Sequence, residues 1–433
     1  MEKSIVSIVK GKAVNKMLRK AIDLIGGIES FVKPGDIVLV KPNAHGAHPP
    51  ESHVDTNPKV VAAVVRLCKA AGAKEVIIGE ASGIGQDSIK SLEVSGIKKA
   101  AEEAGADRFI DLEKDEYIRV EIPKGKLIKY IDLPKTVLTS DVLINVPVLK
   151  THHGTVITCA LKNIKGIIRN LDKKKSHRIG VEWVVPDIHL AKKPNLVVVD
   201  AIVAMEGMGP LGGKWTMEAP NGEKVTLEMV GGEPVEMDLI IASADPVAAD
   251  TTCAKIMGID PEKIPMIRNA YAHGIGKIKP NEMEIKGNKI EEVARKFKLP
   301  PEDLTRYYKY VSIHDEGACS GCRAYLVWAL ENLRARGLLE QRKEKTIVIG
   351  ADHPAILPIE WGRGENLVLI GNCTGKWKGE GAFVPGCPPV GRYFMQAIME
   401  SKVDEVVPEG ETPWIIRFYQ KYPRPLPAYL RQV

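Results

Sequence analysis

The segment Ile37-Val-Leu-Val40 is a short apolar run, and the residues after it complete a strand, helix and strand unit. Asn57-Pro58 supplies the cap and first position of a helix with an apolar stretch at 60–71, and Glu75-Val-Ile-Ile-Gly79 is the next apolar run. Strands that alternate with helices in this way are typical of a mostly parallel sheet. The unit therefore predicts an α/β fold.

The same alternation extends along most of the chain. Further strands are predicted at 142–146, 196–199 and 239–242, and Asp245-Pro246 caps another helix that ends near Gly258. Together these elements predict a large N-terminal α/β domain over residues 1–305, which could contain two subdomains.

A smaller domain is predicted after Pro300-Pro301, where the composition changes. Its elements are a helix over 323–336 stopped by Gly337, strands at 346–349 and 367–370, and a helix after Pro389. We place a βα domain at 306–407. Residues 408–433, rich in proline, aromatic and basic residues, are predicted to form an extended arm on their own domain or on a neighbouring subunit of a homo-oligomer.

The composition of the 433-residue chain excludes several classes of protein. A hydrophobic content of 44% is enough for large buried cores, so the chain is neither disordered nor fibrous. The net charge of +6 is modest and does not require a nucleic-acid partner. Charged residues of both signs make up 27% of the chain, which favours a densely ion-paired surface of the kind found in thermophiles.

The sequence also bears on the cellular location of the protein. No apolar leader follows Met1, and no run approaches the roughly 18 to 20 apolar residues that cross a bilayer. The 7 cysteines, an odd number, do not suit a disulfide framework. We therefore expect a cytoplasmic protein of the anaerobic type, with no membrane partner.

Four of the cysteines form a ligand pattern: Cys319-Ser-Gly-Cys322, Gly-Asn-Cys373 and Gly-Cys387-Pro-Pro. Thiolate sulfur selects iron–sulfur clusters or zinc, and a C-x-x-C pair can place two sulfurs on one metal centre through a tight turn. A [4Fe-4S] cluster is favoured, because zinc ribbons usually carry two C-x-x-C pairs. Structural zinc is the main alternative, and the absence of any metal is a third.

The predicted elements give these cysteines positions. Cys373 follows the carboxyl end of a strand, where open α/β sheets bind their ligands. Cys319 and Cys322 precede the helix 323–336, whose positive N-terminal end favours an anionic cluster. Cys68 and Cys253 instead lie inside apolar helical stretches and are predicted to be small buried core residues.

A second candidate site lies in the larger domain, after the strand that ends at Pro147. Basic and amide side chains are concentrated there and beside the strand 37–40, in a mixture suited to an anion, a metal or a cofactor. Nearby carboxylates could act as acids or bases with a lysine. The candidate catalytic residues are Lys41, Lys150, His152, His153, Lys162, Lys165, Asp200 and Glu206, and the candidate cofactor-binding residues are Lys162, Asn163 and Gly166.

The plainer interpretation of this segment is a solvated basic loop. His152 and His153 would face opposite sides of a strand, so both cannot bind one metal without a bend. His45 and His48 lie near Lys41, but their surroundings indicate only a loop.

Four motifs in the larger domain resemble those of the prokaryotic domain of unknown function 362 family, over residues 1–275. They are Asn145-Val-Pro-Val-Leu-Lys-Thr-His152, Leu161-Lys-Asn-Ile-Lys-Gly166, Val199-Asp-Ala201 with Glu206-Gly207, and Ser243-Ala-Asp-Pro-Val-Ala-Ala-Asp250. The resemblance implies association with iron–sulfur modules, usually ferredoxin-type domains with consecutive C-x-x-C repeats, from which this chain departs. Gly386-Cys-Pro-Pro389 is similar to a cluster-binding stretch of hydrogenase small subunits.

A second similarity concerns the nickel-pincer lactate racemase family. The order of His152, His153, Lys162, Lys165 and Gly166 is similar to that family's segment, in which histidine and lysine hold the cofactor. The similarity implies shared ancestry rather than shared chemistry.

Three classes of function are compatible with these patterns. The first is an iron–sulfur oxidoreductase or electron-transfer protein, whose cluster serves a small anionic substrate at Lys41, Lys150 and Lys162, or a redox partner protein. In the second, one iron lacks a cysteine and acts as a Lewis acid in a dehydratase or lyase. The third is a zinc-stapled binding protein without catalysis. Four cysteine ligands favour the first class, because a fully ligated cluster leaves no iron for a substrate.

Overall fold

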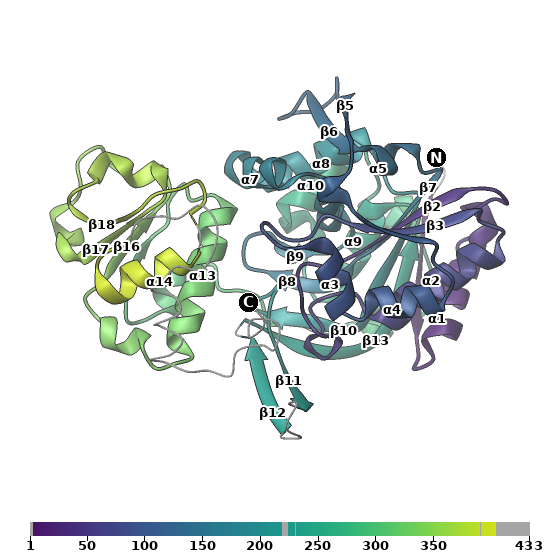
Figure 1. Cartoon of the computed structure of the whole chain (residues 1–433), viewed down its shortest axis with the longest axis horizontal. Helices are drawn as coiled ribbons and strands as arrows, with labels where there is room; N and C mark the ends of the chain where they lie inside the picture. The colour runs from purple at the N-terminus through teal and green to yellow at the C-terminus, as the bar shows by residue number, and fades with distance from the viewer. Residues whose placement is uncertain (1–2, 219–223, 230, 390, 404–433) are drawn as a thin grey trace. The chain divides into compact units, whose positions relative to one another are not determined.

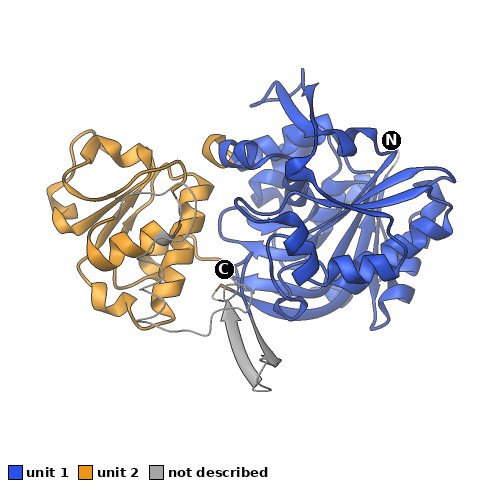
Figure 2. Cartoon of the chain, viewed as in Figure 1, with its two compact units in different colours: residues 1–176, 181–214, 232–299 blue, residues 177–180, 215–231, 300–433 orange. Residues whose placement is uncertain are grey.

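The computed structural model describes residues 3–218, 224–229, 231–389 and 391–403, so the predicted arm at 408–433 lies outside the described residues. The chain divides into two compact units (Figure 2). Unit 1 comprises Met1–Ser176, Val181–Lys214 and Gly232–Leu299, and unit 2 comprises His177–Gly180, Trp215–Gly231 and Pro300–Val433. Within the described ranges, no helix is both long and apolar enough to cross a membrane.

Unit 1 is built on a 10-stranded sheet with the order β14-β1-β13-β10-β7-β2-β3-β4, and β8 and β9 pair beside β10 (Figure 1). The strands from β10 to β4 run parallel, whereas β13 is antiparallel to both β10 and β1. The predicted mostly parallel sheet is confirmed. The strands are β1 (Ser4–Lys10), β2 (Ile37–Pro42), β3 (Glu75–Glu80), β4 (Arg108–Asp111), β7 (Val142–Val146), β8 (Val148–His152), β9 (Val156–Thr158), β10 (Leu196–Gly207), β13 (Gly232–Ser243) and β14 (Met283–Gly287).

The β2-α2-β3 unit shows how the sequence builds one face of this sheet. The Asn57 side chain caps α2 (Pro58–Ala70) by accepting a hydrogen bond from the Lys59 amide. Val38 and Val40 of β2 share a buried core with the valines of α2, and each such side chain contributes about 1.5–3 kcal/mol to folding. Because side chains alternate along a strand, Lys41 points to the opposite face.

That opposite face is covered by α6 (Ala160–Asn163), α8 (Val181–Ala191), α9 (Pro246–Ile256) and α10 (Pro265–Ala272), which pack on one another. Asn145 of β7 donates a hydrogen bond to the Ala160 carbonyl at 2.8 Å, so α6 lies directly over the sheet. Asp245 caps α9 by accepting from the Val247 and Ala248 amides, as predicted. The face that Lys41 joins therefore has a helical cover of its own.

The remaining elements of the larger unit complete its surface. They are α1 (Val14–Asp23), α3 (Ser88–Val94), α4 (Ile97–Glu103), α5 (Lys135–Thr139), α7 (Asn170–Ile179, whose end belongs to unit 2), α11 (Ile290–Val293) and the antiparallel ribbon of β5 (Tyr117–Glu121) and β6 (Tyr130–Pro134). A second two-stranded ribbon is formed by β11 (Gly213–Glu218) and β12 (Lys224–Met229), which lie between β10 and β13 in the sequence.

Unit 2 contains a separate parallel sheet with the order β15-β16-β17-β18. Its core includes Val348, Leu369 and Trp377. The helix predicted over 323–336 begins earlier, at Ser320, so Cys319 is its N-cap and Cys322 lies in its first turn instead of preceding it. The elements are α12 (Leu304–Tyr307), β15 (Ser312–His314), α13 (Ser320–Arg334), β16 (Thr346–Ile349), β17 (Gly364–Ile370), β18 (Gly381–Val384) and α14 (Gly391–Glu400).

Candidate functional site

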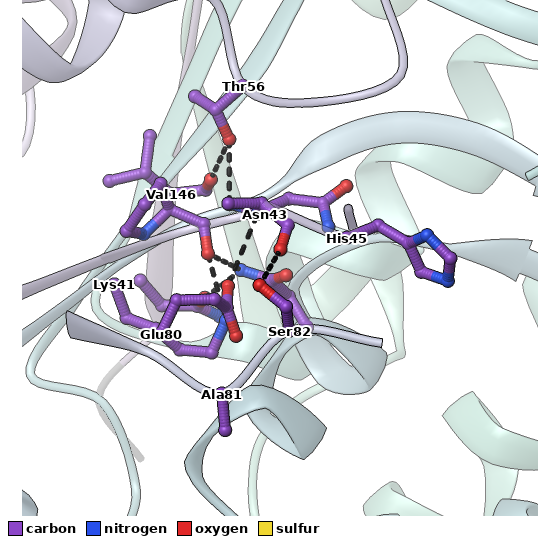
Figure 3. A network of polar contacts seen from close by, with 12 residues as sticks. Lys41, Asn43, His45, Thr56, Glu80, Ala81, Ser82 and Val146 are labelled. Atoms are coloured by element: carbon purple, nitrogen blue, oxygen red, sulfur yellow. Dashed lines mark hydrogen bonds and ion pairs between the residues drawn. The ribbon is translucent and has the colours of Figure 1, made fainter. Parts of the chain in front are cut away.

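A buried ion pair joins the carboxyl ends of β2 and β3 (Figure 3). Lys41 Nζ lies 2.7 Å from Glu80 Oε2 and also donates to the Pro42 carbonyl. The two side chains are 0% and 3% exposed, and burial lowers the pKa of Lys41 and raises the pKa of Glu80. If either charge were removed, the other would stay buried without a counter-charge, which is strongly unfavourable. The ion pair is therefore a structural part of the site.

Gly166 packs its backbone against this ion pair. A Cβ at this position would lie 1.8 Å from Glu80 Oε1 and 2.5 Å from Lys41 Nζ, closer than atoms can approach. The Gly166 carbonyl accepts a hydrogen bond from the Ala81 amide at 2.8 Å. Gly166, a candidate cofactor-binding residue, thus lies where only glycine fits.

Lys150, on β8, is held beside the ion pair by acceptors from the β2 loop. Its Nζ donates to Asn43 Oδ1 at 2.8 Å and to the Val54 carbonyl at 2.7 Å. Burial lowers the pKa of Lys150 to about 8, and the charges of Asp55 and Asp200 oppose that effect. Burial raises the pKa of Asp200 to about 6, although its carboxylate accepts from two backbone amides. The structure therefore brings together Lys150 and Asp200, two of the candidate residues.

Three more lysines follow in α6, in the short 3-10 helix Ile164–Ile167 and in α7. Burial and the charge of Lys150 lower the pKa of Lys162 to about 7. Burial, followed by the charges of Lys162 and Lys173, lowers the pKa of Lys165 well below its usual value. Lys173 donates to the carbonyls of Ala81 and Ser82, both at 2.7 Å. We call Lys41, Lys150, Lys162, Lys165 and Lys173 the lysine cluster.

Two histidines of the β2 loop belong to the same region. The rings of His45 and His48 are stacked, with centroids 5.8 Å apart. Burial, then His48 and three lysines of the cluster, lowers the pKa of His45 well below its usual value, and burial lowers the pKa of His48 to about 3. Both rings are therefore neutral at pH 7 and can donate or accept a hydrogen bond without adding charge.

The candidate residues His152, His153 and Asn163 have local partners. His152 Nδ1 accepts from the Gly154 amide at 2.9 Å, and the two adjacent histidine rings lie 4.7 Å apart. His153 Nδ1 donates to the Gly209 carbonyl at 2.7 Å. Asn163 Nδ2 donates to Asn145 Oδ1 at 2.8 Å. These contacts hold the segment between β8 and α6 in place. That segment precedes Lys162 and Lys165 of the lysine cluster.

Glu206 lies in a different set of contacts. Its carboxylate accepts from Arg295 Nη2 at 3.1 Å and from the Lys298 amide at 2.9 Å. These bonds attach the segment 295–298 to the end of β10. Glu206 thus stabilises the C-terminal part of unit 1 and is not brought to the lysine cluster.

Three residues of the site were missed by the sequence analysis: Glu80, Asp55 and Lys173. Asp250 accepts from the Ala160 and Leu161 amides and so caps α6, which carries Lys162. Burial raises the pKa of Asp250 to about 7. Only Glu80 had a feature in the sequence that could have identified it: it is a carboxylate at the end of an apolar strand, β3.

The four candidate cysteine ligands lie at the carboxyl ends of the unit 2 strands. Cys319 caps α13, Cys322 is buried in its first turn, Cys373 follows β17, and Cys387 follows β18. A hydrogen bond from Cys322, together with backbone amides of the α13 N-terminus, lowers the pKa of Cys319 to about 6. The hydrogen bond to Cys319, then burial and the charges of the other three thiols, raise the pKa of Cys322. All four thiols are therefore within electrostatic reach of one another.

The loops that carry Cys373 and Cys387 are tied together by the protein itself. The Asn372 amide donates to the Gly386 carbonyl at 3.0 Å, and the Gly386 amide donates to Asn372 Oδ1 at 2.8 Å. Gly371 has a φ of +87°, and a Cβ there would lie 3.5 Å from Cys322 Sγ. Backbone therefore approaches the thiols closely on this side.

In the described part of the chain, no three His, Cys, Asp or Glu side chains are arranged to hold one metal ion. A [4Fe-4S] cluster binds each thiolate at a different iron, so its ligands stand farther apart than four thiolates on one zinc. The other three cysteines are buried in unit 1. Cys68 and Cys253 are fully buried, as predicted, and Cys253 Sγ lies 3.8 Å from Cys159 Sγ.

Comparisons with known proteins connect the lysine cluster to a family. The model of DUF362, a domain of unknown function, matches residues 38–255, which include every lysine of the cluster and none of the four candidate cysteine ligands. The thylakoid-associated protein sll1697 of Synechocystis sp. is 30% identical over 266 residues, which cover 57% of this chain and 71% of that protein.

A structural similarity is also found. The lactate racemase apoprotein of Thermoanaerobacterium thermosaccharolyticum matches with a TM-score of 0.35 and 12% sequence identity. The match covers 60% of this chain and 58% of the racemase, so this chain spans less than two thirds of that protein. On the family match and the cyanobacterial relative, the chain belongs to the DUF362 family.

Proposed function

We propose that this protein is a cytoplasmic iron–sulfur oxidoreductase in which Cys319, Cys322, Cys373 and Cys387 hold a [4Fe-4S] cluster. The observation that carries the proposal is that three separate strand ends bring four thiols together: Cys322 is hydrogen-bonded to Cys319, and the loops of Cys373 and Cys387 are joined by hydrogen bonds between Asn372 and Gly386. When bound, such a cluster supplies one-electron transfer.

The residues of unit 2 prepare this site for an anionic group. Backbone amides at the start of α13 favour the thiolate of Cys319. Cys322 is 6% exposed, so its thiolate would be shielded from solvent once a cluster neutralises it. Cys373 is exposed, and electrons would enter or leave most easily on that side, from a redox partner protein.

The residues of unit 1 prepare a site for a small anionic substrate. The lysine cluster supplies positive charge from buried side chains, and Lys150 and Lys162 have pKa values of about 8 and about 7, close to neutrality. Lysines in this range can neutralise a bound anion or move a proton. We assign the cluster the role of binding the substrate that the redox centre oxidises or reduces.

The test is the metal and acid-labile sulfide content of anaerobically purified protein. The proposal requires about four iron and four sulfide per chain, with a visible absorption that dithionite bleaches. One zinc per chain without sulfide would overturn it and leave a structural staple. A fully loaded cluster that dithionite cannot reduce would overturn the electron-transfer role.

A further inference from the structure

The loop between β16 and β17, residues 350–363, exposes two isoleucines. Ile356 and Ile359 are 83% and 89% exposed, whereas the next most exposed large apolar side chain of the described residues, Leu171, is 68% exposed. The two isoleucines are close in sequence, so their Cα atoms lie at most about 11 Å apart. Neighbouring apolar side chains that a folded domain leaves in water mark a surface that another molecule covers.

The exposure of the two isoleucines results from how the loop is held. Leu357, between them, is 4% exposed and packs with Val348 and Trp377 in the core of unit 2. Arg363 donates hydrogen bonds to the Leu357 carbonyl at 3.0 Å and to the Pro358 carbonyl at 3.1 Å. Because the core takes up Leu357 and its carbonyl is fixed, the loop keeps the isoleucines on its outer side.

The same loop is attached to the segment that carries Cys373. This exposed thiol belongs to a short 3-10 helix, Asn372–Trp377, which follows β17. At the end of that helix, Trp377 Nε1 donates a hydrogen bond to the Ala355 carbonyl of the loop at 3.3 Å. The loop and the Cys373 segment therefore form one connected part of the unit 2 surface.

The Cys373 segment is positively charged. Residues 372–378 include Lys376 and Lys378, both exposed, and no acidic residue. Lys376 Nζ donates to the His353 carbonyl of the loop at 3.0 Å, and Lys378 Nζ lies 5.9 Å from the centre of the Phe383 ring. These contacts are neutral, and no carboxylate that the structure describes forms an ion pair with either lysine. Both positive charges are therefore available to a partner.

The chemistry of this surface indicates the kind of partner. The loop also carries the acidic residues Asp352 and Glu360, so the surplus of positive charge is local to the Cys373 segment. A partner with an apolar centre and an acidic edge complements both features. Contacts of less than about 1,200 Å² are typical of transient electron-transfer complexes, whereas permanent dimers bury far more. Two isoleucines and two lysines suit the smaller class.

We propose that Ile356, Ile359, Lys376 and Lys378 form the docking surface for a small acidic electron-carrier protein. One electron passes between the carrier and the proposed [4Fe-4S] cluster beside Cys373, so that one is oxidised, the other is reduced and no bond forms or breaks. This inference rests on the proposed function and names the redox partner of that same site.

The experiment is stopped-flow mixing of the anaerobically purified full-length protein with a [2Fe-2S] ferredoxin, which is an acidic electron carrier. Reduced ferredoxin is mixed with oxidised protein, and oxidised ferredoxin with reduced protein, so that one direction is downhill. The second-order rate constant should fall as salt rises, because salt screens the attraction between lysines and acidic groups. Absence of electron transfer in both directions would overturn the proposal.

Variants locate the surface. Ile356→Ser combined with Ile359→Ser should lower the rate constant about tenfold or more, while the exposure of both side chains leaves the core of unit 2 intact. Lys378→Glu should lower the rate constant at low salt. Lys343→Glu, which reverses an exposed lysine near the amino end of β16, should not. A rate constant equal to that of the parent in the double isoleucine variant would refute the assignment.

Iron, sulfide and the rate of reduction by dithionite are measured in every preparation, because this small reductant needs no docking surface. If these values are normal and the double isoleucine variant reacts with ferredoxin as the parent does, this inference alone is rejected. If the parent contains no iron and sulfide, the proposed function is rejected and this inference with it.

Sedimentation velocity tests the other possible occupant, a second copy of the chain. The parent and the double isoleucine variant should show the same oligomeric state. A parent dimer that the double substitution converts to a monomer would show that the surface is a subunit interface, which would overturn the proposal.

Discussion

The cysteine site and the lysine cluster are built in opposite ways. The four thiols come from three strand ends of one small parallel sheet, and two of their loops are joined by hydrogen bonds between Asn372 and Gly386. The lysine cluster draws on segments from β2 to α7, and its charges are controlled by burial and by one another. The proposed metal binding of the thiols depends on every one of the four cysteines. The properties of the lysine cluster depend instead on the sum of its positive and negative charges.

The largest effect should come from removing one thiol. Cys322→Ala should abolish bound iron and sulfide, because in the proposed cluster each cysteine ligates a separate iron. The measurement is iron, sulfide and visible absorption after anaerobic purification. Cys68→Ala removes another buried thiol, in unit 1, and should keep the full iron and sulfide content. Equal loss or equal retention in the two variants would contradict the ligand assignment.

Breaking the buried ion pair should be the next largest effect. Glu80→Ala leaves the ammonium of Lys41 buried without its partner and should lower the free energy of unfolding by about 3–5 kcal/mol. Urea unfolding followed by circular dichroism measures the change.

Glu206→Ala is the matched control, because that carboxylate is also buried but its partner Arg295 is half-exposed and can return to water. Its loss should be clearly smaller. Iron content should stay normal in both variants, since neither contacts the cysteines; a loss of iron in Glu80→Ala would show that the two sites are coupled.

Filling the space at Gly166 should have an intermediate effect. Gly166→Ala places a methyl group against Glu80 and Lys41 and should cost about 1–3 kcal/mol of stability. Gly274→Ala, at a position with φ of +73° and open space around it, tests the cost of backbone strain alone. The urea midpoint should fall further in Gly166→Ala than in Gly274→Ala, and an equal fall in both would argue against a close approach of the Gly166 backbone to the ion pair.

The smallest effect is a pH dependence of stability in anion-free buffer. The pKa of Lys162 is about 7 in the folded protein against 10.5 ordinarily, so between these values the unfolded chain holds a proton that the folded chain has released. Stability from this group therefore rises with pH across that interval. Lys162→Met should flatten the rise in the urea midpoint between roughly pH 7 and pH 9. If the slope of the urea midpoint against pH were the same in Lys162→Met and in the parent, the pKa of Lys162 would be that of an ordinary, solvated lysine.

The sequence predicted much of this arrangement for physical reasons that can be traced. Apolar runs, the Asn57-Pro58 cap and the Asp245 cap depend only on residues close together in the sequence, and the α/β fold with its mostly parallel larger sheet followed from them. Lys41, Lys150, Lys162 and Lys165 were singled out because they stand beside strand ends, and the structure brings them together.

The rest of the site could not be predicted from the sequence, because it depends on which strands are neighbours in the sheet. Glu80 meets Lys41 only because β3 pairs with β2, and no local pattern fixes that pairing. Glu206 was selected for its glycine-rich surroundings, yet its partner Arg295 is 89 residues away in sequence. Cys322 was placed before a helix, whereas the helix starts at Ser320 and contains it.

The reciprocal hydrogen bonds between Asn372 and Gly386 have a consequence for how the protein is made. Loops that hydrogen bonds within the chain hold in place keep their shape without a cofactor, so the proposed cluster could be inserted after synthesis and folding are finished. A cluster destroyed by oxygen could then be replaced on the same molecule, without a new round of translation.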